Sequence, residues 1–365
     1  MTFTRRTDWV DLPEGVPPSQ HDTPITAADL LRYEQGIYAA HNPNPYVPQL
    51  GQWNTAVARR SVRNPRMVVI GDSAANEAFA WQHQLAGRRY FDPQLAAQVE
   101  GNITDAEFAN GLFNGDTTRF AGLLGLTDID ILFGPDSPAG DYRYDEGPWS
   151  TWPAGAVWSD TYPDAAPLNA YRIDDMNGAN ALTVRAHNGA GYAWFNGIMG
   201  TVAARPLDVM TLAVPGVSAK WWATQLTGTA NDPEVWQYSL PRALVDGFDP
   251  DLIVIALGAN DLDNTDGDEL ATFTANLGSI IDAWRTLQPG ADIAVQTYWQ
   301  PTWAPLRDQT LAVAKAKNTA LLDFWPLIPP YSQHPSLYVD DYHLNTFGHA
   351  LVADIATRSL GIPPA

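Results

Sequence analysis

The chain has 365 residues, a formal net charge of −20 and no cysteine. This charge argues against binding to nucleic acid or to an anionic membrane through bulk electrostatics. Without cysteine the protein has no disulfides, no thiolate nucleophile and no thiolate-bound metal. Hydrophobic residues make up 45% and charged residues 17%, which predicts a large buried core. The apolar runs are far shorter than the ~20 residues that span a bilayer, so we expect no membrane insertion.

Residues 1–65 are expected to form an N-terminal arm. Basic side chains occur near its start, but the apolar stretch of a secretory signal peptide does not follow them, and we expect no signal peptide. Thr26 and Asp29 suit the start of a helix, and apolar residues at helical spacing continue to Ile37. Turn-forming residues at 42–45 end this short helix.

Residues 66–365 are expected to form one enlarged α/β domain. Short apolar runs alternate with helical stretches, and this alternation indicates a parallel sheet covered on both faces. Sites in such sheets form at the carboxyl ends of the strands, where polar, Gly-containing motifs occur in this sequence. The runs occupy 67–70, 209–214, 251–257, 292–297 and 320–324, and the helical stretches include 74–85, 221–225, 306–319 and 346–360.

Residues 92–205 interrupt this alternation. They are rich in Gly, Asp, Pro and aromatic residues. We interpret them as an insertion between the first and second core strands, partly loop and partly short β-structure.

Ser73 follows the first apolar run, in the tripeptide Gly71-Asp72-Ser73. A serine at the tip of a strand-to-helix turn is exposed at the edge of the sheet, and its backbone N–H lies where a helix N-terminus concentrates positive potential. This geometry suits a nucleophile that also stabilises the oxyanion it creates. An Asp-Ser pair is also an ordinary helix cap, so the tripeptide alone is weak evidence.

Asp340-Asp341-Tyr342-His343 is expected in a loop before the last helix. An Asp three residues before a His can accept a hydrogen bond from the imidazole Nδ1–H and leave Nε2 facing the serine. Asp340 has this spacing, whereas Asp341 is expected to face solvent or to cap the next turn. A solvated acidic loop with an exposed His is the alternative.

Gly216 and Asn260 follow two further apolar runs. An Asn side chain at a strand end can donate its amide N–H to a developing oxyanion, a contribution of ~3–4 kcal/mol to the barrier. Gly216 lets the backbone come close and donate its own N–H to the same point. Taken singly, each residue is better explained as an ordinary turn residue after a strand.

Together, the Ser, Gly, Asn and Asp-x-x-His motifs resemble the SGNH (GDSL-type) hydrolase family, which is named for this quartet. The matching stretches are 68–73, 213–219, 256–261 and 340–348, and the resemblance spans 66–361 apart from most of 92–205. It implies a flavodoxin-like three-layer α/β/α sandwich with a parallel central sheet. It also implies hydrolysis of carboxylic esters, often acetyl groups on carbohydrates.

The resemblance assigns a role to each matching residue. Ser73 is the nucleophile, His343 is the base and later the acid, and Asp340 orients His343. The Ser73 N–H, the Gly216 N–H and the Asn260 side-chain amide form the oxyanion hole. The long spacing between Ser73 and Gly216 departs from the family pattern and leaves the substrate class open.

Other patterns in the chain are weaker. The acidic run 261–269 looks calcium-binding, but its Gly and Glu are out of EF-hand register, so an acidic solvated loop is favoured. His349 is expected to pack or to cap, and the remaining histidines show no metal-binding spacing. We therefore expect no metal and no cofactor. Five tryptophans are candidates for a sugar-binding cleft or for core packing: Trp149, Trp152, Trp158, Trp299 and Trp303.

Residues 22–37 resemble a short segment near the N-termini of tailed-bacteriophage tail and baseplate proteins. A generic capped helix is the alternative. The resemblance implies that residues 1–65 dock the chain onto other virion tail proteins, and it is compatible with a homo-oligomer. The chain would then act outside the cell on the host surface, where an ester of a cell-envelope glycan is the natural substrate.

Three functions stay open at this point. The first is a tail-borne SGNH serine esterase that removes O-acetyl or similar esters from surface carbohydrate. The second is a receptor-binding or structural tail module that keeps the fold but little activity, against which the intact quartet argues. The third is a hydrolase of lipid acyl esters, which needs an apolar acyl tunnel rather than the polar, tryptophan-containing insertion seen here.

Overall fold

The fold is known from a computed structural model of the chain. It describes residues 50–362 apart from 77–79, 92–96, 101–103, 107–108, 114–116, 122–125, 134–139, 146, 153–168, 174–180, 187–191, 202–206, 228–243, 246, 264–267 and 326. The predicted helix before residue 42 and the phage-like segment 22–37 therefore lie outside the described residues.

Five parallel strands form the core of the central sheet. In spatial order they are β13 (Leu207–Ala213), β1 (Arg66–Gly71), β14 (Leu252–Ala256), β15 (Asp292–Gln296) and β16 (Ala320–Leu322). In chain order this arrangement reads 2-1-3-4-5, which is the order of flavodoxin-like folds. Nearly every residue of these strands is buried, because helices cover both faces. The predicted fold class is confirmed.

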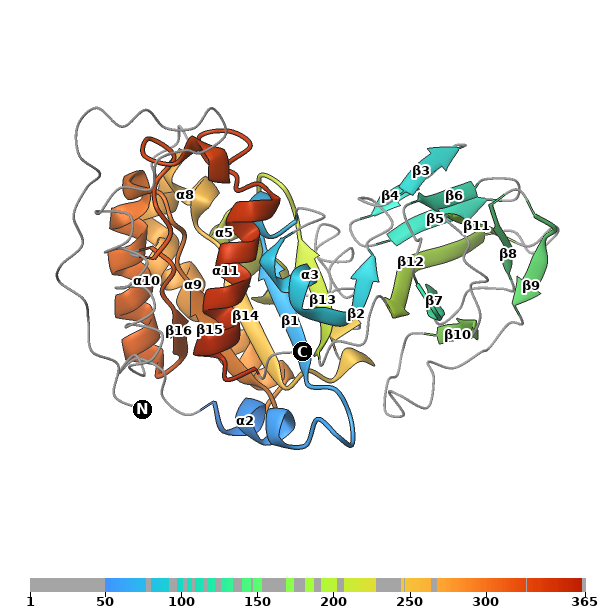
Figure 1. Cartoon of the computed structure of the whole chain (residues 1–365), viewed down its shortest axis with the longest axis horizontal. Helices are drawn as coiled ribbons and strands as arrows, with labels where there is room; N and C mark the ends of the chain where they lie inside the picture. Colours follow the sequence, from blue (N-terminus) through green and yellow to red (C-terminus); the bar gives the residue numbers. More distant parts are fainter. Residues whose placement is uncertain are drawn as a thin grey trace, which may run out of the picture.

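Two groups of helices cover this sheet. Helix α3 packs against α11 on one face, while α9 packs against both α5 and α10 on the other (Figure 1). Among the described helices, none combines the length and apolarity needed to cross a bilayer. The bounds of these helices are Trp81–Leu85 (α3), Ala219–Thr227 (α5), Asp268–Leu287 (α9), Ala304–Lys317 (α10) and Thr346–Ser359 (α11).

The stretch predicted as one helix over 74–85 is divided in the structure. A 3₁₀ turn, Ser73–Ala75, follows β1, and α3 begins only at Trp81. Ala80 has an extended backbone, with φ −49° and ψ 149°, so the two pieces cannot form one continuous helix. The nucleophile candidate therefore begins a short, tight turn.

The predicted insertion is rich in β-structure. Part of it lengthens the central sheet beyond β13: β2, which directly precedes the insertion, pairs parallel with β13, and antiparallel strands of the insertion follow in the order β12, β7 and β10. A second antiparallel sheet has the order β3-β6-β11-β8-β9. The bounds are Ala86–Phe91 (β2), Ala97–Glu100 (β3), Thr104–Ala106 (β4), Ala109–Phe113 (β5), Thr117–Ala121 (β6), Ile129–Phe133 (β7), Gly140–Tyr144 (β8), Ser150–Trp152 (β9), Asn169–Ile173 (β10), Ala181–Ala186 (β11) and Tyr192–Thr201 (β12).

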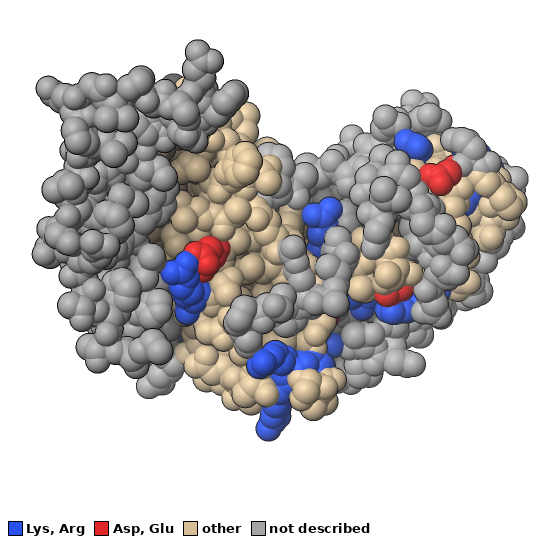
Figure 2. Space-filling view, viewed as in Figure 1, with Lys and Arg blue, Asp and Glu red and all other residues tan. Residues whose placement is uncertain are grey.

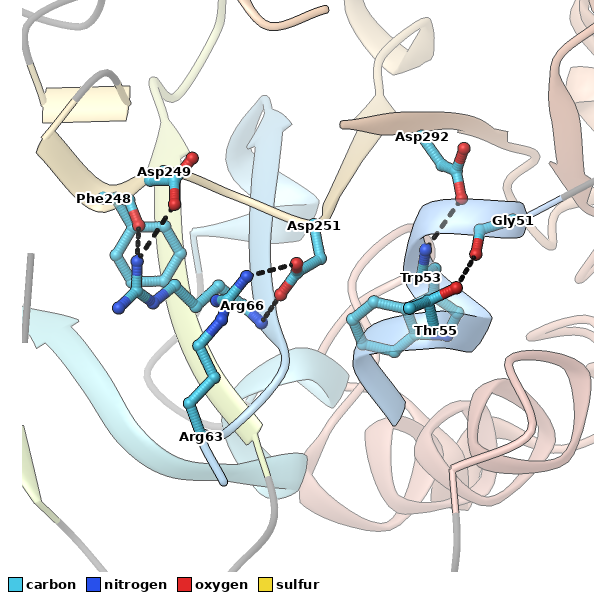
Figure 3. A network of polar contacts seen from close by, with 9 residues as sticks. All are labelled: Gly51, Trp53, Thr55, Arg63, Arg66, Phe248, Asp249, Asp251 and Asp292. Atoms are coloured by element: carbon cyan, nitrogen blue, oxygen red, sulfur yellow. Dashed lines mark hydrogen bonds and ion pairs between the residues drawn. The ribbon is translucent and has the colours of Figure 1, made fainter. Parts of the chain in front are cut away.

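Helix α2 (Gly51–Ala58) falls within the predicted arm but packs as part of the core. Its Trp53 is fully buried and donates its indole N–H to the carbonyl of Leu360 at 2.8 Å. The backbone N–H of Trp53 donates to a carboxylate oxygen of Asp292, at the start of β15 (Figure 3). The core therefore begins before residue 66.

Charged residues fix the amino ends of the neighbouring strands (Figure 3). Asp251, just before β14, accepts hydrogen bonds from the side chain of Arg63 at 2.6 Å and from the backbone N–H of Arg66 at 2.9 Å. Arg66 also donates to the carbonyl of Phe248 at 3.1 Å. These contacts join the chain entering β1 to the chain entering β14.

The two ends of the core differ: one carries basic side chains, and the other borders a hollow. Lys and Arg gather at its lower end in Figure 2, over the segment that follows α2, where Arg59, Arg60 and Arg63 are exposed. The carboxyl ends of β1 and β13 point the other way, and there the outline is hollowed between the core and the insertion (Figures 1 and 2). The predicted site residues follow these carboxyl ends.

Candidate active site

Ser73 lies directly beyond the carboxyl end of β1, at the start of the 3₁₀ turn. A carboxylate oxygen of Asp72 accepts a hydrogen bond from the Ala74 N–H at 3.1 Å, which caps the turn. Gly71 is required for the close packing beneath it, because a Cβ there would lie 2.4 Å from the Ala75 Cβ. The turn is thus held tightly against the sheet, with Ser73 only partly buried.

A hydrogen-bonded relay runs from Ser73 to His343 and on to Asp340. The Ser73 Oγ lies 3.2 Å from His343 Nε2. On the other side of the ring, His343 Nδ1 lies 2.9 Å from Asp340 Oδ2. The three side chains predicted as nucleophile, base and orienting carboxylate are therefore brought together, although His343 follows Ser73 by 270 residues in the chain.

Asp340 is held as an anion by the loop that carries His343. Partial burial raises the pKa of its carboxyl, but donors from the loop outweigh this effect and leave the pKa below the ordinary value. These donors are the His343 N–H, the His343 ring and the Tyr342 N–H, with backbone distances of 2.7 Å and 2.8 Å. An anion here can stabilise an imidazolium on His343. Asp341 is exposed.

Asn260 lies in the short helix α8 (Ala259–Asp263), just after β14. Its side-chain amide donates to the carbonyl of Val217 at 3.0 Å. A primary amide carries two donor hydrogens, so the second can serve an oxyanion. Gly216, the residue before Val217, has φ +78°, a conformation that L side chains rarely adopt. The structure therefore joins the loop of Gly216 to the helix of Asn260.

Asp261 strengthens the same connection. Its two carboxylate oxygens lie 3.2 Å and 3.0 Å from the Ala219 N–H, at the start of α5, and its side chain is buried. The expectation of a solvated loop over 261–269 is therefore wrong for Asp261. Residues 264–267 lie outside the described residues, and in the part of the chain that is described no cluster of three or more His, Asp or Glu residues could hold a metal.

Asp72 has a second connection that sequence reasoning missed. The hydroxyl of Tyr298, two residues beyond β15, lies 2.7 Å from Asp72 Oδ1. Burial raises the pKa of Asp72 to about 6, although the Tyr298 hydroxyl, the N–H groups of Ala74 and Ala259 and the charge of His343 all oppose the shift. The two carboxylates near His343 thus have pKa values displaced in opposite directions. Only the position of Tyr298, directly after the apolar run 292–297, could have suggested from the sequence that it lies near the site.

Two of the five tryptophans that were candidates for a sugar-binding cleft are core residues. Trp299 and Trp303 are 1% and 3% exposed, so they are core residues and do not line a sugar-binding cleft. The ring of Trp149 is stacked by the guanidinium groups of Arg143 and Arg185, at 4.7 Å and 3.9 Å from its centre. The side chains of Trp152 and Trp158 lie outside the described part. His349 packs edge-on against Trp299 and is fully buried, as its predicted packing role requires.

Replacing Asp72 by Asn tests the charge state of the buried carboxyl. Because its pKa is raised from 3.8 to about 6, the folded wild type retains a proton that the unfolded chain releases, so unfolding free energy falls as pH rises through this window. We expect the stability of Asp72→Asn relative to wild type to rise by roughly 2 kcal/mol between pH 4 and pH 7, measured by urea unfolding. Asp341→Asn is the control for losing one negative charge. Parallel wild-type and Asp72→Asn curves would contradict the buried-acid account.

Comparison with known proteins agrees with this geometry. Residues 155–351 match the GDSL-like lipase/acylhydrolase family, a range that includes Gly216, Asn260, Asp340 and His343 but begins after Ser73. Because this match covers more than half of the chain, it shows the family, while the contact with His343 brings Ser73 into the site.

Similar solved structures were also found. A peptidoglycan O-acetylesterase is 14% identical, with a TM-score of 0.57 over 87% of this chain and 97% of that chain. A family two carbohydrate esterase from Clostridium thermocellum, in complex with cellohexaose, is 15% identical, with a TM-score of 0.33 over 73% of this chain and 100% of that chain. No curated protein sequence matches the chain. The chain belongs to the GDSL-like lipase/acylhydrolase family and is an esterase of the SGNH type.

Proposed function

We propose that Ser73, His343 and Asp340 hydrolyse O-acetyl or similar esters on cell-surface carbohydrate. The observation that carries this proposal is the relay of hydrogen bonds from Ser73 Oγ to His343 Nε2 and from His343 Nδ1 to Asp340. A relay of this kind lets a weak hydroxyl nucleophile lose its proton as it attacks. The same relay argues against a tail module that has the fold but little activity.

In the first half of the reaction the serine becomes acylated. The Ser73 Oγ attacks the ester carbonyl carbon while its proton passes to His343 Nε2, and Asp340 stabilises the resulting imidazolium. The Ser73 N–H, the Gly216 N–H and the Asn260 amide would donate to the oxyanion of the tetrahedral intermediate. When the intermediate collapses, the carbon–oxygen bond to the sugar breaks, and His343 gives its proton to the departing sugar hydroxyl.

In the second half water releases the acyl group. His343 accepts a proton from a water molecule, whose oxygen attacks the acyl carbon of the serine ester. The second tetrahedral intermediate uses the same oxyanion donors. Its collapse returns the proton to Ser73 Oγ and releases acetate, so the enzyme is restored without any cofactor.

The exposure of the relay favours a carbohydrate ester over a lipid ester. The His343 and Asp340 side chains are 34% and 49% exposed, so the relay lies at the protein surface. Tyr342, next to His343, and Phe347, in the first turn of α11, are 38% and 75% exposed and offer flat apolar surface to a sugar ring. A polymeric glycan can reach such a site, and the solved peptidoglycan O-acetylesterase with this fold provides further support.

We also propose that the enzyme is carried on a phage tail and that the hydrolase acts on the host surface. Within the predicted arm 1–65, the part that precedes α2 would bind other tail proteins or further copies of the chain, since α2 itself packs in the core. The support is the resemblance of residues 22–37 to tail and baseplate segments, together with the net charge of −20, which suits solubility outside a cell. An antibody against residues 66–365 should label purified virions at the tail. Virions that lack the protein would contradict this placement.

Ser73→Ala tests the nucleophile directly. We expect wild-type protein to react covalently with a fluorophosphonate probe and to hydrolyse p-nitrophenyl acetate, because the relay activates the Ser73 hydroxyl. Ser73→Ala should lose the probe adduct and lower kcat by roughly 10³-fold or more. Ser279→Ala, which alters an exposed serine of α9, is the control. Equal labelling of wild type and Ser73→Ala would contradict the assignment.

Substrate profiling tests the ester class. We expect release of acetate from O-acetylated cell-envelope glycans, and among p-nitrophenyl esters we expect kcat/KM to fall as the acyl chain grows from acetyl to octanoyl. The physical reason is that an exposed relay buries little of a long acyl chain. Ser73→Ala supplies the background rate for every substrate. A kcat/KM that rises with chain length, with no acetate released from glycans, would favour the lipid-ester alternative.

A further inference from the structure

Two adjacent residues after β15, Tyr298 and Trp299, contact the chain segments that hold all parts of the candidate relay. Both side chains are buried, with exposures of 4% and 1%. Their rings meet edge to face, with centres 5.4 Å apart. Neither residue belongs to the motif stretches 68–73, 213–219, 256–261 and 340–348, and their contacts reach beyond hydrophobic packing.

The Tyr298 hydroxyl joins the nucleophile turn to the strand that leads to Asn260. It lies 2.7 Å from Asp72 Oδ1 and 2.7 Å from the carbonyl oxygen of Ala256. Asp72 caps the turn that begins at Ser73, and Ala256 is the last residue of β14. The same hydroxyl therefore spans the two segments that must present the nucleophile and the oxyanion donor together.

Counting protons shows how this contact depends on Asp72. A tyrosine hydroxyl has one hydrogen to donate, and the Ala256 carbonyl can only accept. When Asp72 is protonated, it can donate to Tyr298 while Tyr298 donates to Ala256. When Asp72 is ionised, both neighbours compete for one hydrogen. Two further titratable groups act on the pair of Asp72 and Tyr298: His343 acts on Asp72, and Asp261 acts on Tyr298.

Trp299 holds the loop of the base. Its indole N–H donates to the carbonyl of Tyr342 at 3.1 Å, and Tyr342 directly precedes His343. The Trp299 ring also packs edge-on against His349 of α11, with centres 6.0 Å apart. Trp299 thus joins the chain after β15 both to the loop of His343 and to α11.

We propose that Tyr298 and Trp299 are positioning residues that set the alignment of Ser73, the oxyanion strand and His343. Neither side chain touches the reacting atoms; Tyr298 acts through Asp72 and Ala256, and Trp299 acts through the Tyr342 carbonyl. The inference rests on the proposed function of Ser73 and His343. Each residue could serve by packing or by alignment. Packing needs only the aromatic ring, whereas alignment needs the Tyr298 hydroxyl or the Trp299 indole N–H.

The test uses variants that keep a ring and remove a donor. Tyr298→Phe and Trp299→Phe are compared with wild type and with Tyr90→Phe, which changes a buried tyrosine of β2. For each protein, kcat and KM are measured on p-nitrophenyl acetate, and kcat is expressed per site titrated by a fluorophosphonate probe. This normalisation separates misaligned sites from misfolded protein, and thermal unfolding is recorded in parallel.

We expect Tyr298→Phe and Trp299→Phe each to lower kcat per titrated site by about tenfold or more, with KM changed less than about twofold. Tyr90→Phe should keep the wild-type kcat per site. Because Tyr298 acts through Asp72, the double variant Asp72→Asn/Tyr298→Phe should lose much less than the product of the two single losses.

The outcomes separate the inference from the function on which it rests. If Ser73→Ala hydrolyses the ester as fast as wild type, the proposed function fails. If Ser73→Ala is inactive while Tyr298→Phe and Trp299→Phe keep wild-type kcat per titrated site, the function stands and the positioning role is wrong. The positioning role would also be wrong if the variants lost activity only because fewer sites were titrated. It would be wrong as well if the loss of kcat in the double variant equalled the product of the two single losses.

Discussion

The parallel register of β1 between β13 and β14 is the constraint on which the site depends. Gly71 is the Cα partner of Ala213 on one side and of Ala256 on the other, so three strands end at one level. Ser73, Gly216 and Asn260 follow these three ends within a few residues. The long spacing between Ser73 and Gly216 does not disturb this arrangement, because the insertion leaves and rejoins the sheet beside β13. A change in register would separate the proposed nucleophile from the proposed oxyanion donors.

Two carboxyl groups near the His343 imidazole have pKa values shifted in opposite directions. Asp340 is partly exposed and surrounded by N–H donors, so it stays ionised and can balance a positive charge on His343. Asp72 is fully buried beside Ser73, where burial favours the neutral acid. The environment, rather than the residue type, therefore determines what each acid can do.

The sequence predicted the core strands and the order of the site motifs because both depend on local patterns. Buried parallel strands are continuous apolar runs, and the site residues sit at their ends. The division between Ser73–Ala75 and α3 was missed, since helical propensity cannot reveal the extended backbone of Ala80. Tyr298 was missed because its partner Asp72 lies 226 residues away in the chain. Asp261 was misread as solvated, since only tertiary packing buries it against α5.

The most direct test of the relay and its oxyanion donors is a crystal structure of the protein after reaction with a small fluorophosphonate. We expect a phosphorus–oxygen bond to Ser73 Oγ, with the phosphonyl oxygen at about 3 Å from the N–H groups of Ser73 and Gly216 and from the Asn260 amide. His343 would remain hydrogen-bonded to Asp340. An adduct on another residue, or a phosphonyl oxygen turned away from Gly216 and Asn260, would contradict the account.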